Sequence, residues 1–231
     1  MGVIYEIDKI FEYGTGSIKI GFPATYKLSI ESTKKWMRIA KTIKEVENPC
    51  YSRAIGVVLV DPDTNTLVSS GHNGPPVNCP QNDDPDYLAK VVWPQLTADE
   101  QSVALNKIDA VSDKLAFNSP LNVFTAEYGN CKTCPRKHID APSGKRLELC
   151  SCAHAEHNAV INAHRSVIGC YMICYCGVPC LECCKTIINA GIDKVVCIEK
   201  QIDYSLYSSR WVLGKSNVDL FIVSESWLNQ S

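Results

Sequence analysis

The chain has 231 residues, of which 45% are hydrophobic and 21% are charged. These are ordinary values for a globular protein, so the chain can bury a real core as one large domain or as one domain with a sizeable insertion. Its 23 basic and 25 acidic side chains give a formal net charge of −2. That balance argues against a general nucleic-acid binder, which would carry a basic face.

Thirteen cysteines are many for a chain of this length. The N-terminus shows no basic segment followed by an apolar core and a small-residue cleavage site, and the longest apolar runs are too short to span a bilayer. We therefore expect a cytoplasmic protein, in the host-cell cytoplasm if the chain is viral, with no membrane partner. In a reducing compartment, cysteines in C-x-x-C spacing are more often metal ligands than disulfides. Isolated cysteines are then expected to be small buried hydrophobes: Cys170, Cys174 and Cys197.

The N-terminal third begins with residues 1–31, which carry two short apolar alternations broken by glycine and proline. We predict an N-terminal arm or a small hairpin there. Ser32 or Thr33 can then cap a helix that continues to about residue 45, because apolar residues recur at helical spacing.

A hairpin and a fixed loop are predicted next. Residues 54–60 are a nearly continuous apolar, β-branched run of strand length, and a turn at 61–65 leads to a second strand at 66–70. The glycines and prolines of the loop Gly71–Pro76 exclude regular structure and hold the side chains between them in place.

Residues 80–128 are polar and contain at least one helical segment, at about 98–115. They have too few apolar residues for a core of their own, so we predict an insertion on a single domain that covers residues 32–231. The motif-bearing helix follows at 153–164. After it, strands alternate with helices of about ten residues: strand 170–176, helix 180–190 closed by Gly191, strand 194–199, helix 205–214 and strand 218–223.

This alternation implies right-handed crossovers and helices on both faces of a mostly parallel sheet. The predicted fold class is therefore α/β, as a three-layer α-β-α sandwich around a mixed, mostly parallel five-stranded sheet.

The strongest chemical pattern is His154-Ala155-Glu156 followed by Pro179-Cys180-Leu181-Glu182-Cys183. Cys180 and Cys183 lie three residues apart and can chelate one ion from a helix start, where the macrodipole favours thiolates. With His154 they form the ligand set of a catalytic zinc site that keeps one position open. Zinc lowers the pKa of a bound water towards ~7, and Glu156 is placed to move its proton to the substrate.

A closed, structural zinc site is the alternative, with Cys152, Cys184 or His157 as fourth ligand. Such a site has no use for Glu156, so we favour the catalytic interpretation. A second, structural zinc is also predicted from knuckle-like spacing in another part of the chain. Its ligands would be Cys131, Cys134 and Cys150, with Cys79, His138 or Cys152 as the fourth.

The H-x-E…P-C-x-x-C pattern is the recorded signature of zinc-dependent base deaminases. The chain resembles the cytidine deaminase superfamily and, within it, the deoxycytidylate deaminase branch, over about residues 33–223. Four segments carry the likeness to the branch: Ser52–Gly56, Gly71–Pro76, Ile187–Ile192 and Cys134–Cys150, the last resembling members with a second zinc.

The resemblance implies roles for residues outside the metal set. Asn73 would contact the sugar, Ser52 and Ala155 would lie at the nucleotide pocket, and Glu156 would be the proton shuttle. The loop that resembles the effector-binding loop contains Gly71, His72, Asn73 and Gly74, and His72 stands where the branch usually has tyrosine. Residues 175–178 also depart from the branch pattern at the base pocket.

Several residues are candidates for binding the phosphate group of the substrate. The guanidinium group of arginine binds a phosphate best, through two parallel hydrogen bonds, but such a side chain is more often simply a solvated surface charge. The candidates are Arg136, Arg53, Lys132, Lys137, Arg165, Tyr204 and Arg210.

The resulting hypothesis is hydrolytic deamination of dCMP to dUMP and ammonia by a zinc enzyme, supplying thymidylate synthesis. The resemblance implies a homo-oligomer, often a homohexamer, with dCTP and dTTP as effectors. Deamination of dCTP, a modified dCMP or another pyrimidine is the nearer alternative. A polynucleotide deaminase and a non-catalytic zinc protein are the more distant ones.

Overall fold

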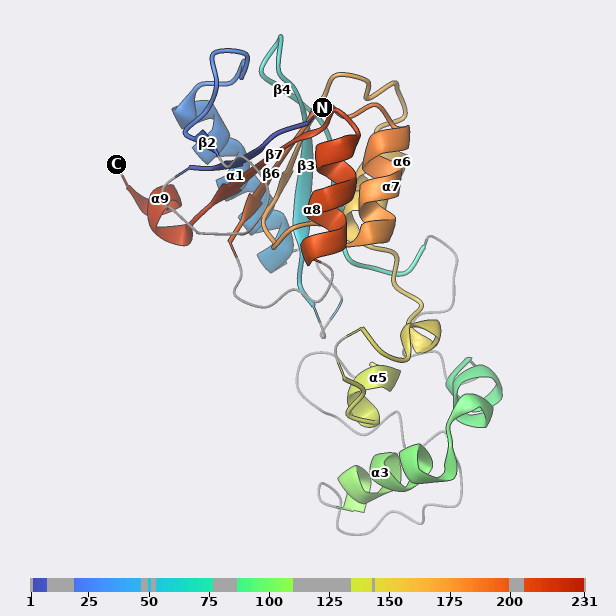
Figure 1. Cartoon of the computed structure of the whole chain (residues 1–231). Coiled ribbons are helices and arrows are strands. Elements are labelled where there is room, and N and C mark those ends of the chain that lie inside the picture. Colours follow the sequence, from blue (N-terminus) through green and yellow to red (C-terminus); the bar gives the residue numbers. More distant parts are fainter. Residues whose placement is uncertain are drawn as a thin grey trace. The chain divides into compact units, whose positions relative to one another are not determined.

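The computed structural model describes residues 2–7, 19–46, 50, 53–76, 87–109, 134–142, 144–199 and 206–230 (Figure 1). The chain divides into two compact units. The first, which we call the sheet unit, comprises Met1–Asn48, Ala54–Asn73 and His154–Ser231. The second, the inserted unit, comprises Pro49–Arg53 and Gly74–Ala153. No helix among the described residues is both long and apolar enough to cross a membrane.

The sheet unit is built on a seven-stranded mixed sheet with the order β2-β1-β7-β6-β5-β3-β4. The strands β5, β6, β7, β1 and β2 all run parallel to one another, and β3 is antiparallel to both β5 and β4. The strand bounds are β1 Ile4–Glu6, β2 Lys19–Ile20, β3 Gly56–Asp61, β4 Thr66–His72, β5 Tyr171–Cys174, β6 Lys194–Ile198 and β7 Asp219–Val223.

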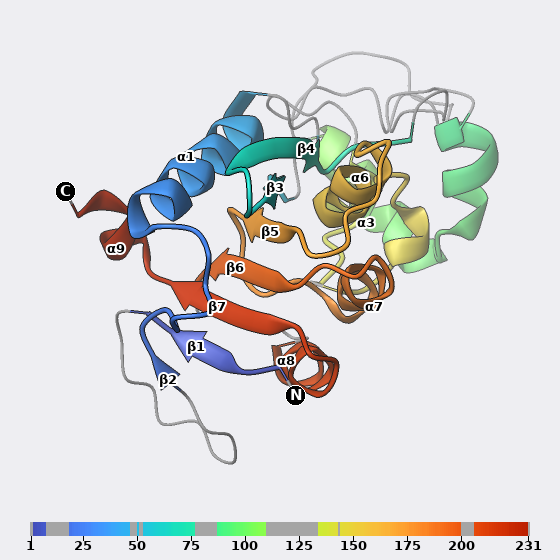
Figure 2. The same cartoon turned by 90° about the horizontal axis from the view of Figure 1, so that it is seen from above.

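Helices cover both faces of this sheet, as Figure 2 shows. On one face lie α6 (Ala155–Ile161), α7 (Leu181–Asn189) and α8 (Leu206–Lys215), and on the other lie α1 (Ile30–Val46) and α9 (Glu225–Asn229). The three-layer α/β fold and the mixed, mostly parallel sheet are thus confirmed.

Two apolar clusters fill the spaces between the layers, because successive residues of a strand point to opposite faces. Val57 and Leu59 of β3 belong to the cluster under α6, α7 and α8, whereas Val58 and Val60 belong to the cluster under α1 and α9. A strand that is buried on both faces reads as a continuous apolar run, which is why β3 was visible in the sequence.

The prediction of five strands was wrong in number, because the N-terminal segment adds two short strands. β1 lies parallel to β7, and β2 lies parallel to β1, so the two are not a hairpin either. The Val3 backbone N–H also donates to Asp219 Oδ1 at 2.8 Å. Strands of two and three residues are too short to show a pattern of their own, and long-range pairing with β7 is what specifies them.

The predicted elements are present with shifted ends. Helix α1 begins at Ile30, before Ser32 and Thr33, and Ser29 acts at its start: Ser29 Oγ accepts from the Ser32 backbone N–H at 3.0 Å. Helix α7 ends at Asn189, and Gly191, which follows the C-cap Ala190, takes a left-handed φ of 72° as expected. Helix α9, which no pattern indicated, starts at Ser224, whose Oγ accepts from the Trp227 backbone N–H.

The inserted unit has a small apolar cluster, which combines residues of the 80–128 segment with Ile139 and Leu149 from beyond it. Its fully buried members include Leu88, Val92 and Leu149. The elements around it are η1 Leu88–Val92, η2 Trp93–Gln95, α3 Ala98–Asp109, α5 Pro135–His138 and η3 Leu147–Leu149. The helix predicted at 98–115 is confirmed as far as Asp109, and the rest lies outside the described residues.

Candidate metal and catalytic site

Two helix starts in the sheet unit supply the candidate site. Cys180 is the N-cap residue of α7, and Cys183 lies in its first turn with a fully buried side chain. His154 is the N-cap residue of α6. Helix N-termini carry unsatisfied N–H groups and a positive dipole end, so both positions favour a negatively charged ligand atom.

His154, Cys180 and Cys183 bring one ligand atom each to a common point. His154 Nδ1 lies 3.2 Å from Cys183 Sγ and 3.4 Å from Cys180 Sγ, and the two sulfurs are 3.4 Å apart. Zinc bonds to imidazole nitrogen and thiolate sulfur place tetrahedral ligand atoms about 3.5 to 3.8 Å apart. The three atoms therefore fit a zinc ion with little adjustment.

The protonation of one cysteine suits a metal, because the pKa of Cys180 is lowered, whereas the hydrogen bond with Cys180 and burial raise the pKa of Cys183. Hydrogen bonding from the Cys183 thiol, and then from the His154 ring, lowers the pKa of Cys180 to about 3, although burial acts in the opposite direction. A thiol must lose its proton to bind zinc, so a low pKa reduces the cost of occupying the site.

Glu156 is the carboxylate beside this triangle. It is the second residue of α6, its side chain is only 3% exposed, and Oε2 is buried with no hydrogen-bond partner. Burial raises its pKa, because the charged form is the one that loses hydration. A buried carboxylate oxygen without a partner is costly, and it marks a place for a water molecule or a ligand.

A side chain from another segment caps the first turn of α6. The N-cap His154 makes no side-chain capping bond, and instead Asn73 Oδ1 accepts from the Ala155 backbone N–H at 2.8 Å. Asn73 is 5% exposed and Ala155 is fully buried. The structure therefore places Asn73 and Ala155 together at the start of α6.

The residues considered as a fourth metal ligand lie elsewhere. Cys184 is fully buried and its Sγ donates to the Pro179 carbonyl at 3.4 Å. His157 is half-buried, and its ring stacks on that of His154 at 6.0 Å between centroids. Among the residues that the structure describes, the compact group of ligand atoms has three members, as a catalytic zinc site requires.

The chain matches a known protein family over most of its length. Residues 30–199 match the family model described as the cytidine and deoxycytidylate deaminase zinc-binding region. The chain belongs to this family. The match spans both cysteines of the triangle, His154 and Glu156; the chain therefore has a zinc-binding region, and the triangle could hold the ion.

Relatives with names agree with the family. The deoxycytidylate deaminase of Schizosaccharomyces pombe is 43% identical over 70 residues, which are 29% of this chain and 22% of the relative. That of Saccharomyces cerevisiae is 42% identical over 64 residues, so the chain spans only about a fifth of the length of these two proteins. The deoxycytidylate deaminase of Enterobacteria phage T4 is 27% identical over 202 residues, covering 84% of this chain and 91% of the phage protein.

Among solved structures, the dCMP deaminase of the cyanophage S-TIM5 in complex with dCMP and dUMP is similar with a TM-score of 0.48 and 18% identity. The match covers 84% of this chain and 98% of the cyanophage chain.

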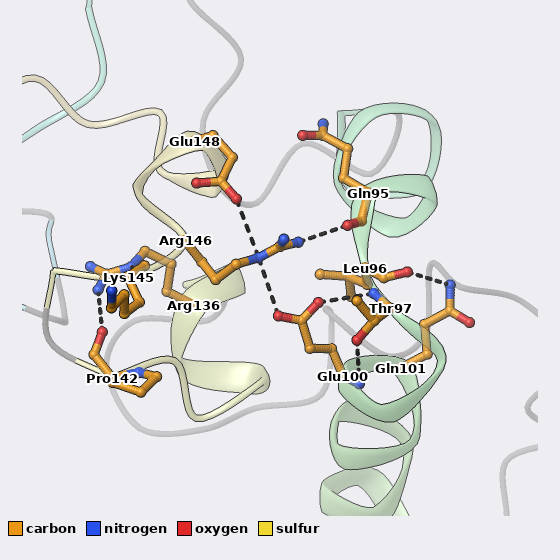
Figure 3. Close-up of polar contacts among 10 residues, drawn as sticks. All are labelled: Gln95, Leu96, Thr97, Glu100, Gln101, Arg136, Pro142, Lys145, Arg146 and Glu148. Atoms are coloured by element: carbon orange, nitrogen blue, oxygen red, sulfur yellow. Dashed lines mark hydrogen bonds and ion pairs between the residues drawn. The ribbon is translucent and has the colours of Figure 1, made fainter.

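Some of the predicted site residues have polar partners of their own, and others lie outside the described residues. Ser52, Cys79 and Cys131 belong to the latter group, with Lys132 and Tyr204. Arg136 lies in the inserted unit, where its guanidinium donates to the carbonyls of Lys145 at 2.8 Å and Pro142 at 3.1 Å (Figure 3). Arg165 forms an ion pair with Asp61 at 3.2 Å.

The inserted unit contains a second group of thiols. The Cys152 thiol is in hydrogen-bond contact with Cys150 and Cys50, and these contacts, together with burial, raise its pKa. Cys134 is buried at the start of α5. Cys50 was missed in the sequence, because it stands alone in the chain and no C-x-x-C spacing draws attention to it.

Proposed function

We propose that the protein is a zinc-dependent hydrolase that converts dCMP to dUMP and ammonia. The observation that carries this proposal is the juxtaposition of the three ligand atoms with Glu156, whose buried Oε2 has no partner. The substrate class comes from the family, and the nucleotide from the relatives named deoxycytidylate deaminase.

The chemistry replaces the amino group on C4 of cytosine by oxygen from water. Zinc held by His154, Cys180 and Cys183 supplies the Lewis acidity that lowers the pKa of the attacking water. Glu156 takes the proton that this water loses and donates it to N3 of the ring as the C–O bond forms at C4. It then carries the second proton to the amino group, so that the C4–N bond breaks and ammonia leaves.

Burial assists Glu156 in this task, because a carboxyl group with a raised pKa both accepts and returns a proton near neutral pH. In this proposal Ala155 and Asn73 line the nucleotide pocket, and the Asn73 amide group donates to the sugar. Its oxygen is already bonded to the Ala155 N–H, which fixes the direction in which the amide nitrogen points.

The decisive experiment is a substrate panel with the zinc-loaded protein, scored by ammonia release. We expect turnover of dCMP, and less or none of deoxycytidine, dCTP, 5-substituted dCMP and a cytosine-containing oligonucleotide. Glu156→Gln should lower kcat by about 10²-fold or more while zinc content stays unchanged, because it removes the proton acceptor and keeps the shape. Turnover that survives in Glu156→Gln would falsify the mechanism.

We further propose a structural zinc in the inserted unit. The contacts of Cys152 with Cys150 and Cys50 support it. Cys134, Cys131 and Cys79 remain the other candidate ligands. Two zinc ions per chain by elemental analysis would support the proposal, and one ion would contradict it.

Regulation is also proposed from the family likeness of the segment with Gly71, His72, Asn73 and Gly74, whose first two residues end β4, and assembly is proposed from the family as a whole. We expect activation by dCTP, inhibition by dTTP and a homohexamer in the cytoplasm. Assays with each nucleotide and light scattering of the purified protein test these expectations separately.

A further inference from the structure

Helix α6 is too short to hold its own position. It runs from Ala155 to Ile161, and helices of this length are unstable in isolation because nucleation costs more than the few hydrogen bonds return. Its N-cap side chain, His154, makes no capping bond, since it serves as a candidate metal ligand. Tertiary contacts must therefore decide where the first turn, and with it Glu156, is placed.

Strand β4 provides those contacts through two hydrogen bonds of opposite direction. Asn73 Oδ1 accepts from the Ala155 N–H at 2.8 Å, and Asn158 Nδ2 donates to the His72 carbonyl at 2.8 Å. The two bonds join consecutive residues at the end of β4 to positions on either side of Glu156. Together they fix the helix against both sliding and rotation at that point.

The backbones approach closely at the same place. A Cβ atom at Gly71 would collide with backbone atoms of Ala155 and Ala159, and Ser69 Oγ donates to the Ala159 carbonyl at 2.6 Å. Helix α6 thus lies directly on the strand. Because the contact leaves no space for adjustment, the helix has one register in which the polar bonds form.

Two asparagines of α6 donate hydrogen bonds to the edge strand of the sheet. β4 is an edge strand, and Asn158 and Asn162, one helical turn apart, donate to the carbonyls of His72 and Ser70. The two bonds are chemically alike, with lengths of 2.8 Å and 3.1 Å. They differ in position, because only the Asn158 bond lies close in the chain to Glu156 and Asn73. This gives a natural control for the role of Asn158.

We propose that Asn158 is a positioning residue for the proton shuttle. By holding the His72 carbonyl, it keeps Asn73 where its side-chain oxygen caps α6, and so it fixes the first turn that bears His154 and Glu156. The proposal rests on the deaminase function, because Glu156 is a shuttle only in that reaction.

The experiment compares Asn158→Ala with Asn162→Ala in the full chain. Each variant loses one helix-to-strand hydrogen bond, so similar decreases in melting temperature are expected. Asn158→Ala should lower kcat for dCMP about tenfold or more relative to Asn162→Ala, since sub-ångström displacement of a catalytic group costs rates of this order. The cobalt-substituted Asn158→Ala protein should show shifted d–d absorption bands, and cobalt-substituted Asn162→Ala should match wild type.

The two readouts separate failure of this proposal from failure of the proposed function. If wild type does not turn over dCMP, the function is wrong, and the cobalt spectra alone decide whether Asn158 positions the site. If wild type is active and the two variants agree in kcat and in spectrum, the positioning role is overturned. Should Asn158→Ala fail to fold, Asn158→Asp, which keeps the shape without the donor, replaces it with the same expected results.

Discussion

The two compact units hold their thiols in different settings. In the sheet unit, Cys180 and Cys183 stand beside a histidine and a buried carboxylate, within a unit that has two large apolar clusters of its own. In the inserted unit, Cys152 contacts the thiols of Cys150 and Cys50, and the apolar cluster among the described residues is smaller. In our proposal, metal binding therefore serves reaction chemistry in the sheet unit and stability in the inserted unit.

The difference follows from the size of the cores. A unit with a broad sheet covered on both faces buries enough apolar surface to fold without a metal. A unit with a small apolar cluster commonly needs a cross-link, such as a disulfide or a structural zinc. The free energy of zinc binding then adds to the free energy of folding. Loss of metal should therefore have different consequences in the two units.

The largest expected effect is on the catalytic thiols. Cys183→Ser should lose one zinc per chain and reduce dCMP turnover to background, while far-UV circular dichroism stays close to wild type. The matched control is Cys184→Ser, since the hydroxyl can still donate to the Pro179 carbonyl and the residue is no ligand. Unfolding of the sheet unit in Cys183→Ser would break the comparison, because it would make that zinc structural.

Removal of the second thiol group should act on stability. Cys152→Ser should expose the inserted unit to limited proteolysis and lower the zinc content by one ion per chain. Cys170→Ser, a buried position in the sheet unit, serves as the control and should keep both zinc ions. If the inserted unit of Cys152→Ser resists protease as wild type does, its thiols do not stabilise the unit. The proposed difference between the two units would then be wrong.

The sequence predicted the architecture of the sheet unit because its signals are local. Continuous apolar strands such as β3, helical spacing in α1 and the glycine that closes α7 each leave a pattern within a few residues. The grouping of His154, Cys180 and Cys183 was equally predictable, since the two cysteines share a helix start and His154 stands two residues from Glu156.

What escaped prediction depends on contacts between distant segments. Strand β1 is specified by pairing with β7, more than 200 residues away, and Asn73 caps a helix 82 residues further along the chain. Cys50 joins Cys152 only through the fold. No periodicity or spacing rule detects such pairs, because the partner residues are ordinary when each is seen alone.

A smaller effect is expected from the polar contacts that hold α3 in the inserted unit (Figure 3). Thr97 and Glu100 form a capping box: the Glu100 N–H donates to Thr97 Oγ1 at 3.3 Å, and the Thr97 N–H donates to Glu100 Oε2 at 2.9 Å. Glu100 Oε1 also lies 3.2 Å from Arg146 Nε. Glu100→Ala should therefore lower the stability of α3 by about 1–2 kcal/mol.

Hydrogen exchange of the α3 amides measures this change locally. Asp99→Ala, in the same turn, is the control and should cost a few tenths of a kcal/mol, because it removes only a charge near the helix start. Faster exchange limited to the inserted unit would sharpen the comparison, whereas equal acceleration in β5 and β6 would mean that the two units unfold together.

The smallest expected effect lies in the sheet unit and depends on pH. Tyr175 is 4% exposed, and its hydroxyl donates to Glu225 Oε1 at 2.8 Å. Burial, and then the contact with Glu225, raises the pKa of Tyr175 to about 12. Because the unfolded chain loses this proton near its ordinary pKa of about 10, the stability contribution is complete below pH ~10 and is lost as pH rises towards ~12.

Tyr175→Phe should cost about 0.5–1 kcal/mol near neutral pH, since one hydrogen bond to a solvent-accessible carboxylate is lost. It should also decline less than wild type above pH ~10, because the group that binds its proton more tightly in the folded state is gone. Thermal unfolding of both proteins across this range tests the difference, with hydrogen exchange in α3 as the reference for the inserted unit. Parallel alkaline declines in the two proteins would show that Tyr175 does not titrate with folding, and its hydrogen bond to Glu225 would then add no pH-dependent stability to the sheet unit.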